Sequence, residues 1–276
     1  MDKFSKKTIE LAYREDVGSG DITSRATVPG SLTGKAIIRA KSPGVLSGID
    51  AFIFAMRLSS LKIRVLFYQK DGQKFVPGDK IAVVTGPARA ILRGERLALN
   101  LLSHLSGVAT MTAEFVGKIK GTKAMILDTR KTTPGLRRLE KQAVIHGGGQ
   151  NHRLGLYDMI LIKDNHIDAA GGVSKALQKV NKRNCKVEIE VGDFVQLREA
   201  LRFDPDIIML DNFSVRDLRR AVRMIRRNKP KIKIEVSGGV DLKRVGSIAR
   251  TGVDYISVGA LTHSTMAADF SMRYVK

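Results

Sequence analysis

The chain has 276 residues, of which 43% are hydrophobic, with a net charge of +21 and a single cysteine, Cys185. This length provides a substantial core in one or two domains, and no apolar run approaches the roughly 18 residues that span a bilayer. The lone cysteine excludes an internal disulfide and is typical of a reducing compartment. Since no apolar signal-like segment follows the first residues, we expect a cytoplasmic protein.

The first hundred residues indicate an α+β domain. Residues 5–15 predict a short amphipathic helix. The acidic, glycine-broken stretch 15–23 predicts a loop and favours a structured turn over a metal or phosphate site. Turn signals then separate short strand-like pieces. These are 35–40, 44–47, 62–68 and 80–86, with a helix at 49–58.

A long helical region starts at Pro87 and continues to residue 119, with Gly107 as a candidate break. Its wide apolar surface favours burial between domains or subunits. Arg96 lies in this apolar stretch beside Glu95. Taken alone, it is better explained as part of a surface pair, or as a side chain whose stem packs on apolar neighbours, than as a functional residue.

From residue 123 the pattern changes to strands that alternate with amphipathic helices, which predicts parallel strands with crossover helices. Expected strands are 125–128, 159–163, 187–191, 207–211, 232–237 and 255–259. Expected helices are 136–145, 169–182, 193–203, 215–227 and 242–250, with a last helix near 267–274. No glycine-rich dinucleotide-binding fingerprint follows the first of these strands, so an α/β barrel is favoured.

The basic charge is densest between residues 215 and 233, where six arginines accompany apolar residues at helical spacing. The arginines therefore occupy the outer face of a helix, which favours a solvated surface over a nucleic-acid site. Five tyrosines and no tryptophan leave few stacking surfaces for single strands. Basic charge also speeds the capture of an anionic substrate.

A polar residue or a glycine follows every one of the predicted parallel strands, at the end where barrels carry their active sites. Donors suited to carboxylates or phosphates gather around two of these strand ends. They are Arg130, Lys131, His152, Arg153, Lys163 and His166. We therefore expect a pocket for a small, highly charged anion.

The later strand ends carry acids and glycines. Glu190 is nearer its strand end than Glu188, and with Asp211 it forms a carboxylate pair able to face a developing cation or a hydrated metal, or to form internal salt bridges. The loop at Ser237, Gly238 and Gly239 and the loop at Gly259 are typical of barrel loops that bind phosphate through backbone N–H groups.

Several motifs closely resemble the quinolinate phosphoribosyltransferase family, also called carboxylating nicotinate-nucleotide pyrophosphorylases, over nearly the whole chain. The most specific is Asp128-Thr-Arg-Lys-Thr-Thr-Pro-Gly-Leu-Arg137, followed by Asn151-His-Arg153 and Leu161-Ile-Lys-Asp-Asn-His166. Glu188-Ile-Glu-Val191, Leu210-Asp-Asn212 and Val258-Gly-Ala-Leu-Thr-His-Ser264 extend it.

This resemblance implies an N-terminal α/β sandwich domain, residues 1–106, with which a C-terminal helix at 267–276 packs. It also implies an incomplete α/β barrel of six or seven parallel strands at residues 107–266. A homodimer, or a larger assembly, with a shared active site is implied too.

The implied reaction converts quinolinate and phosphoribosyl pyrophosphate into nicotinate mononucleotide, pyrophosphate and CO2, with Mg²⁺. By position, quinolinate would contact Arg96, Arg130, His152, Arg153 and Lys163, with Arg96 supplied by the second subunit. Phosphoribosyl pyrophosphate would contact Lys131, Glu190, Asp211, Ser237, Gly238, Gly239 and Gly259. Catalytic roles fall to Glu190, Asp211 and Lys131, and Glu190 and Asp211 hold the metal directly or through water.

Two alternatives stay open from the sequence. One is a related phosphoribosyltransferase that uses nicotinate or another substrate. The other, of a different class, is a basic nucleic-acid-binding protein on a barrel scaffold, for which the charge is the only argument.

Overall fold

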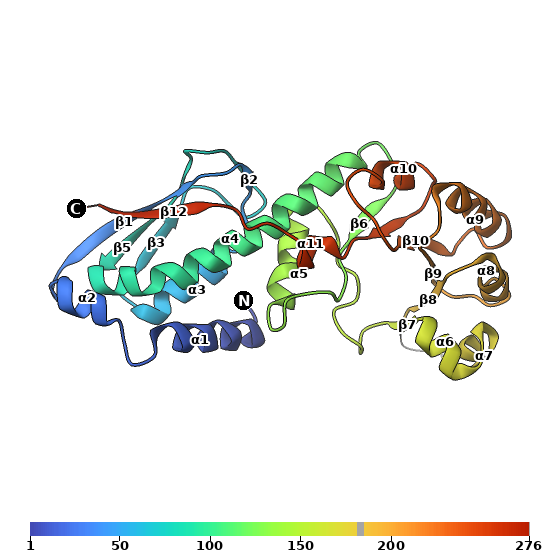
Figure 1. The fold of residues 1–276 in the computed structure, drawn as a ribbon, viewed down its shortest axis with the longest axis horizontal. Coiled ribbons are helices and arrows are strands. Elements are labelled where there is room, and N and C mark those ends of the chain that lie inside the picture. Colours follow the sequence, from blue (N-terminus) through green and yellow to red (C-terminus); the bar gives the residue numbers. More distant parts are fainter. Residues whose placement is uncertain (181–184, 276) are drawn as a thin grey trace. The chain divides into compact units, whose positions relative to one another are not determined.

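The computed structural model describes residues 1–180 and 185–275, which form two compact units (Figure 1). Unit 1 comprises Met1–Ala113, Thr132–Gly148 and Leu261–Lys276, and unit 2 comprises Glu114–Lys131 and Gly149–Ala260. The boundary expected between residues 106 and 107 lies within the helix Ala88–Lys118, and the division into two compact units falls in the same helix, at Ala113. Among the described residues, no helix is long and apolar enough to cross a membrane.

Unit 1 is built on an antiparallel sheet of four strands in the order β12-β1-β5-β3. Their bounds are β1 Thr33–Ala40, β3 Arg64–Phe67, β5 Lys80–Pro87 and β12 Phe270–Val275. Two short strands, β2 (Gly44–Val45) and β4 (Lys74–Phe75), form a separate antiparallel pair. Of these strands, β4 was not predicted.

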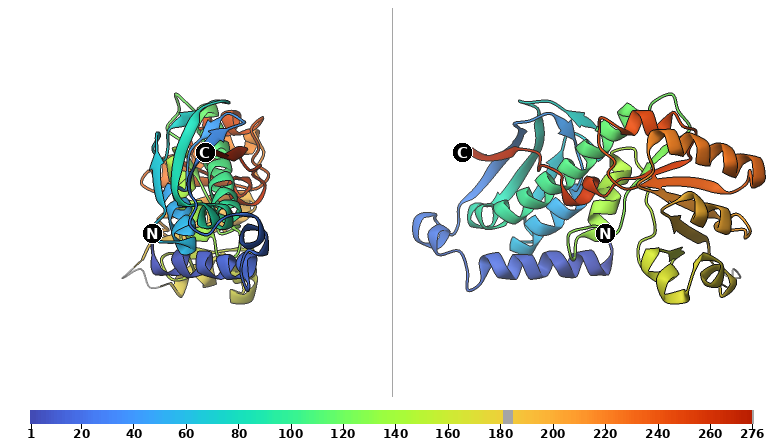
Figure 2. Two further views of the ribbon diagram at one scale, coloured as in Figure 1. Left: turned by 90° about the vertical axis from the view of Figure 1, so that its left-hand side faces the viewer. Right: turned by 45° about the vertical axis from the view of Figure 1, so that its right-hand side comes forward.

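Helices cover one face of this sheet, as the α/β sandwich expectation requires (Figures 1 and 2). The contact of Phe52 on α3 with Phe67 on β3, at 5.5 Å between ring centroids, fixes one helix against the strands. The helices of unit 1 are α1 Lys3–Val17, α2 Ile22–Thr27, α3 Ile49–Ser59, most of α4 Ala88–Lys118, α5 Arg137–His146 and α11 Ala260–His263, which starts at the boundary.

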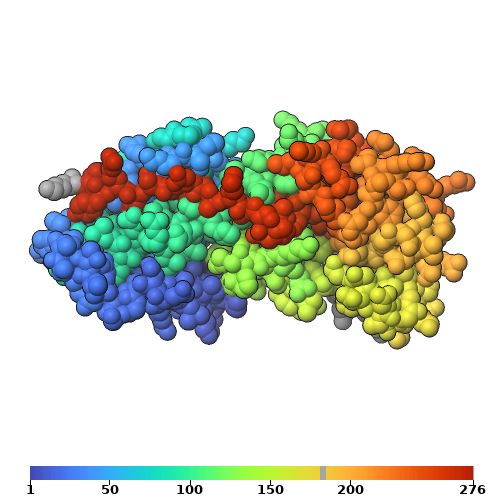
Figure 3. All heavy atoms as spheres, viewed as in Figure 1, coloured from blue at the N-terminus to red at the C-terminus, as the bar shows by residue number. Residues whose placement is uncertain are grey.

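The C-terminal segment is a strand, so the helix predicted near residues 267–274 is wrong. Strand β12 pairs antiparallel with β1 from Phe270 opposite Ala40 to Val275 opposite Lys35, and Figure 3 shows it, in red, along the surface of unit 1. Phe270, Met272 and Tyr274 alternate with polar residues, which is the period of a strand. Without β12, the backbone N–H and C=O groups along one edge of β1 would lack partners in the sheet, and the pairing satisfies these groups in both strands.

Helix α4 continues through Gly107, where a break was predicted. A Cβ at this position would lie 2.2 Å from the carbonyl oxygen of Met266. Glycine is therefore required because another backbone segment approaches the helix closely, and its effect on helix propensity is tolerated.

The loop predicted at residues 15–23 is a short turn at residues 18–21, with helical residues on both sides of it. Helix α1 continues to Val17, and Asp21 is the N-cap of α2, with its carboxylate accepting from the backbone N–H of Ser24 at 2.9 Å. Capping explains this aspartate without a metal or phosphate.

Unit 2 is a sheet of six strands in the order β6-β11-β10-β9-β8-β7, parallel in every pairing. The strands are β6 Met125–Leu127, β7 Ile160–Ile162, β8 Val187–Val191, β9 Ile207–Asp211, β10 Lys233–Ser237 and β11 Tyr255–Ser257. Strands β6 and β7 are the two edges, and the bridge from Leu127 to Gln150 adds a short extended segment beside β6. This confirms an incomplete α/β barrel with six strands.

Helices α6 to α10 follow one another along one side of this sheet (Figures 1 and 2). Their bounds are α6 Asp164–Ala170, α7 Val173–Gln178, α8 Phe194–Ala200, α9 Val215–Asn228 and α10 Val245–Ala249. The single helix predicted at 169–182 is divided, because Gly171 and Gly172 have φ values of 82° and 124°. Its last two positions, 181–182, lie outside the described residues.

Candidate functional site

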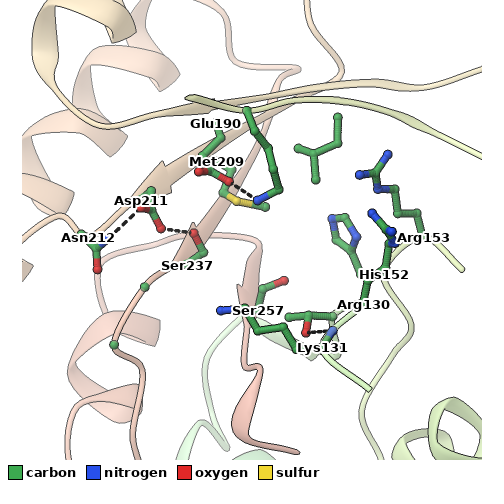
Figure 4. A pocket seen from close by; sticks show the side chains of 15 residues that line it. Arg130, Lys131, His152, Arg153, Glu190, Met209, Asp211, Asn212, Ser237 and Ser257 are labelled. Carbon is green, nitrogen blue, oxygen red and sulfur yellow. Dashed lines mark hydrogen bonds and ion pairs between the residues drawn. The ribbon is translucent and has the colours of Figure 1, made fainter. Parts of the chain in front are cut away.

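A cavity of about 470 Å³ lies in unit 2, where the parallel strands end (Figure 4). Each of the six strands contributes a wall residue, either from its own length or from the loop that follows it. The lining residues are Thr129, Arg130, Lys131, His152, Arg153, Leu161, Lys163, Glu190, Met209, Asp211, Asn212, Ser237, Gly238, Gly239 and Ser257. Parallel strands present their carboxyl ends at one rim, so residues far apart in sequence meet there.

The cavity brings together all the predicted site residues except Arg96, His166 and Gly259. Arg96 is exposed on α4 in unit 1, and Gly259 lies between β11 and α11. His166, which the sequence placed among the donors, is exposed, and its Nδ1 accepts from the backbone N–H of Lys163 at 3.0 Å. It therefore orders the strand end and does not line the cavity.

Cationic side chains dominate one side of the cavity, where Figure 4 shows Arg130, His152 and Arg153 together. Burial lowers the pKa of Arg153, and the charge of Arg130 lowers it further. Two guanidinium groups close to each other repel, so an anion between them removes an unfavourable interaction as well as adding favourable ones. The Nη1 of Arg153 already donates to the carbonyl oxygen of Met159, at 3.1 Å.

Lys163 and Glu190 connect the cationic side to the acidic side. The Lys163 Nζ donates to Glu190 Oε2 at 2.6 Å, and the lysine side chain is 43% exposed against 13% for the glutamate. Half-exposed ion pairs of this kind contribute modestly to stability. The pair keeps both side chains extended toward the same space.

Asp211 is held on both oxygens. Ser237 Oγ donates to Oδ1 at 2.5 Å and Asn212 Nδ2 donates to Oδ2 at 2.7 Å. Gly238 makes this possible, because its φ is 85° and a Cβ there would lie 2.2 Å from Asn212 Oδ1. Asn212 itself has φ 57°, the one positive value among the described residues other than glycine.

Two fully buried carboxyl groups, Glu188 and Glu235, lie behind the cavity wall and are called the buried acid pair below. Glu188 Oε2 is 2.8 Å from His152 Nε2, and Glu235 Oε1 is 3.7 Å from the same nitrogen. Burial raises the pKa of each glutamate to about 8, and the negative charge of Glu188 adds to the rise for Glu235. Glu188 is thus deeper than Glu190, as its position on the strand predicted.

Some wall and supporting residues were not selected from the sequence. Met209 and Ser257 line the cavity, and Met209 lies two residues before Asp211 on the same face of β9, so strand alternation could have identified it. Arg244 was missed because its role depends on the tertiary fold: its Nη1 donates to the carbonyl oxygen of Gly239 at 2.9 Å. This bond holds the carbonyl group of Gly239 in the glycine loop.

Two family models match the chain. The model described as the quinolinate phosphoribosyl transferase C-terminal domain covers residues 108–273, and the model of its N-terminal domain covers residues 21–106. Together they extend over most of the sequence. The chain belongs to the quinolinate phosphoribosyl transferase family.

Curated relatives agree with this membership. A probable carboxylating nicotinate-nucleotide pyrophosphorylase of Bacillus subtilis is 44% identical, over 97% of this chain and 92% of its own length. A decarboxylating quinolinate phosphoribosyltransferase of Nicotiana tabacum is 42% identical, over 97% of this chain and 81% of its own length.

A solved structure has the same fold. The nicotinate-nucleotide pyrophosphorylase of Francisella tularensis superposes with a TM-score of 0.93 at 38% identity, covering 99% of this chain and 96% of the other. This similarity includes both the small sheet unit and the incomplete barrel.

Proposed function

We propose that the protein transfers the phosphoribosyl group of phosphoribosyl pyrophosphate to quinolinate with decarboxylation. The products are nicotinate mononucleotide, pyrophosphate and CO2, a step of NAD biosynthesis. One observation carries this proposal: a single cavity, in a chain of this family, has a cluster of cations on one side and two carboxylates with a glycine loop on the other. A doubly negative pyridine and an activated sugar phosphate need those two chemistries side by side.

The cationic side accounts for quinolinate. Arg130, His152, Arg153 and Lys163 offer donors to two carboxylates, and guanidinium groups bind carboxylates through paired hydrogen bonds. The electrostatic repulsion between Arg130 and Arg153 is relieved when a dianion binds. A substrate with only one carboxylate leaves part of this repulsion in place, which favours quinolinate over nicotinate.

The opposite side accounts for the sugar phosphate. Lys131 and the loop of Ser237, Gly238 and Gly239 are suited to phosphate oxygens, and Gly259 provides a further backbone position at the next strand end. Glu190 and Asp211 flank the ribose, where loss of pyrophosphate leaves positive charge on the anomeric carbon. Fixed carboxylates stabilise that charge.

The chemistry then needs no protein nucleophile. The cations hold the pyridine nitrogen in line with the anomeric carbon, so the new C–N bond forms as the bond to pyrophosphate breaks. The pyridine nitrogen is now positively charged, and the adjacent carboxylate leaves as CO2 because the ring stabilises the electron pair left behind. Solvent supplies the proton that completes nicotinate mononucleotide.

Glu190 and Asp211 also fit a role toward Mg²⁺. Their oxygens are the ligands that Mg²⁺ prefers, and the ion usually keeps several waters and bridges to substrate phosphates. Both carboxylates already accept hydrogen bonds from protein groups, so contact through water fits them best. Bound there, Mg²⁺ would neutralise charge on the departing pyrophosphate.

We further propose a homodimer in which Arg96 of one subunit reaches the quinolinate side of the other. Arg96 is exposed on α4, next to the buried Leu97. Mixing inactive Arg96→Ala and Arg130→Ala proteins should restore part of the activity, since mixed dimers contain one intact site. No recovery at any mixing ratio would argue against a shared site.

A single cysteine is typical of reducing compartments, and we place the reaction in the cytoplasm.

The substrate assignment is tested by incubating purified protein with phosphoribosyl pyrophosphate, Mg²⁺ and either quinolinate or nicotinate. We expect nicotinate mononucleotide from quinolinate and, because one carboxylate is missing, at least tenfold lower kcat/KM for nicotinate, about 1.4 kcal/mol or more. Faster turnover of nicotinate would instead establish the related activity.

A further inference from the structure

The buried acid pair does not line the cavity, yet it contacts a residue that does. Glu188 on β8, Glu235 on β10 and the imidazole of His152 present ligating atoms within 4.8 Å of one another. Both glutamates have 0% exposure, while His152 belongs to the cavity wall. The pair therefore acts on the cavity only through its neighbours.

Buried carboxyl groups contact both the imidazole ring and the backbone of His152. Its Nε2 lies 2.8 Å from Glu188 Oε2 and 3.7 Å from Glu235 Oε1. Ser257 Oγ donates to Glu235 Oε1 at 2.5 Å, which fixes that carboxyl, and the backbone N–H of His152 donates to buried Asp128 at 2.8 Å. A carboxyl group on one ring nitrogen sets the orientation of a histidine and which nitrogen carries the proton.

A packing role does not explain why there are two acids. Glu188 alone would orient the ring, and a second buried carboxyl beside it costs free energy. Glu188 Oε1 and Glu235 Oε2 accept from no other group among the described residues, and the two carboxyls hydrogen-bond to each other, which requires a proton on one of them. An apolar side chain at position 235 would fill the same space without that cost.

The three groups also resemble a metal-ligand set, but the charges oppose that use. The contact of 2.8 Å between His152 Nε2 and Glu188 Oε2 is a direct hydrogen bond. Lys163 and Arg153 already act on Glu188 as positive neighbours, and a further cation would be repelled by both. Orientation of the imidazole is the better explanation.

We propose that Glu235 is a positioning residue that acts through His152. With Glu188 it holds the Nε2 edge of the ring toward the buried side, so that the rest of the ring is presented to a carboxylate of the substrate. Ser257 keeps Glu235 in place. This inference rests on the proposed function, because its readout is the binding of quinolinate.

A double-mutant cycle tests it, with Glu235→Gln made in the wild type and in His152→Ala. Glutamine keeps the size of the side chain and replaces the carboxyl group by an amide, which cannot ionise. In the wild type we expect the KM for quinolinate to rise by about five- to twentyfold, a typical coupling for residues in contact, with the KM for phosphoribosyl pyrophosphate unchanged. In His152→Ala the same substitution should have no further effect.

If Glu235→Gln raises the quinolinate KM by the same factor in both backgrounds, Glu235 does not act through His152 and the inference is wrong. Asp254→Asn is the matched control, since this carboxyl of unit 2 bonds to Arg226 on α9 and lies outside the cavity wall. It should leave both KM values unchanged.

A wild type that makes no nicotinate mononucleotide would overturn the proposed function itself. Normal wild-type turnover with an additive cycle would overturn only the role of Glu235. Should Glu235→Gln fail to fold, the cycle is made with Ser257→Ala, which removes the bond that fixes Glu235. The same criterion of additivity then decides.

Discussion

Lys163 shows how single residues combine two functions in this cavity. Its backbone N–H donates to His166 and its Nζ to Glu190 Oε2, so the side chain begins at an ordered strand end and reaches the acidic side. A carboxylate of bound quinolinate would be a second anionic partner for the Lys163 ammonium group in the cavity. Residues of the cavity are therefore interdependent, and substitutions should change substrate binding more than folding.

Replacement of Lys163 by alanine is predicted to raise the quinolinate KM or to abolish turnover. The expected loss in kcat/KM is at least about 100-fold, since a charge-assisted contact is removed and Glu190 loses its partner. Lys175→Ala, on the exposed face of α7 in the same unit, is the matched control and should behave as the wild type. Equal steady-state kinetics in the two variants would contradict the assigned pocket.

Gly238→Ala is predicted to inactivate the protein while leaving most of its stability. A Cβ at this φ of 85° would meet Asn212 Oδ1 at 2.2 Å, so Asn212 must move and its bond to Asp211 is lost. Kinetics with varied phosphoribosyl pyrophosphate should show the defect on that substrate. Gly78→Ala, also at a positive φ but with no atom within 4 Å, controls for backbone strain alone.

The buried acid pair also makes stability depend on pH. Folding raises the pKa of Glu235 from its usual 4.5 to about 8, so in this range the folded state holds a proton that the unfolded state releases. Its stabilising contribution is complete below pH 4.5 and is lost as the pH rises through 8. Glu235→Gln should remove that part of the decline, which thermal unfolding between about pH 5 and 8 measures. Parallel curves for wild type and variant would contradict the raised pKa.

At the scale of elements, hydrophobic periodicity was sufficient to predict several strands and helices that form the core of unit 2. Strands β8 and β9 have the predicted bounds, and α9 differs by one residue, because a long apolar run or a strong helical stripe leaves few alternatives. The arginines of α9 are mostly exposed while Leu218, Ala221, Val222 and Ile225 are buried, which confirms an outer, solvated helix.

Elements whose structure depends on distant partners could not be predicted in the same way. Strand β12 exists because β1 offers it an edge, and Gly107 is explained by the backbone at Met266, which is far away in sequence. Among site residues, the cations and acids were predicted from their positions at strand ends. Glu235 and Arg244 were not, because their roles come from contacts between strands and loops.

Two glycines of α4 give a matched test of this explanation. Gly107→Ala should lower the midpoint of thermal unfolding, by the equivalent of about 1–3 kcal/mol, because its Cβ would lie 2.2 Å from a carbonyl oxygen. Gly117→Ala, with nothing within 4 Å, should raise stability by about 0.5–1 kcal/mol through better helix propensity. Equal effects at both positions would show that Met266 does not approach the helix in this way.

At the scale of the whole molecule, the net charge of +21 is large for an enzyme with small substrates. Both proposed substrates are anions, so the charge favours their capture over long distances. Such steering is screened by salt within about 10 Å at 0.1 M ionic strength. Nucleic-acid binding, the alternative of a different class, would use the same charge.

Raising the ionic strength from about 0.02 to 0.5 M should therefore lower kcat/KM for both substrates several-fold, with a smaller effect on kcat. Substitution of the exposed arginines of α9 by glutamine should weaken this salt dependence. If kcat/KM did not change with salt, steering would be excluded. A gel shift with a steep salt slope, unaffected by quinolinate, would favour the nucleic-acid alternative.

Simultaneous measurement of CO2 and pyrophosphate released from quinolinate and phosphoribosyl pyrophosphate tests most directly whether this cavity joins a dianionic pyridine to an activated sugar. We predict equal amounts of the two products, dependent on quinolinate and lost in Lys163→Ala. Pyrophosphate released without CO2, or no release of either product by the wild type, would contradict the assignment.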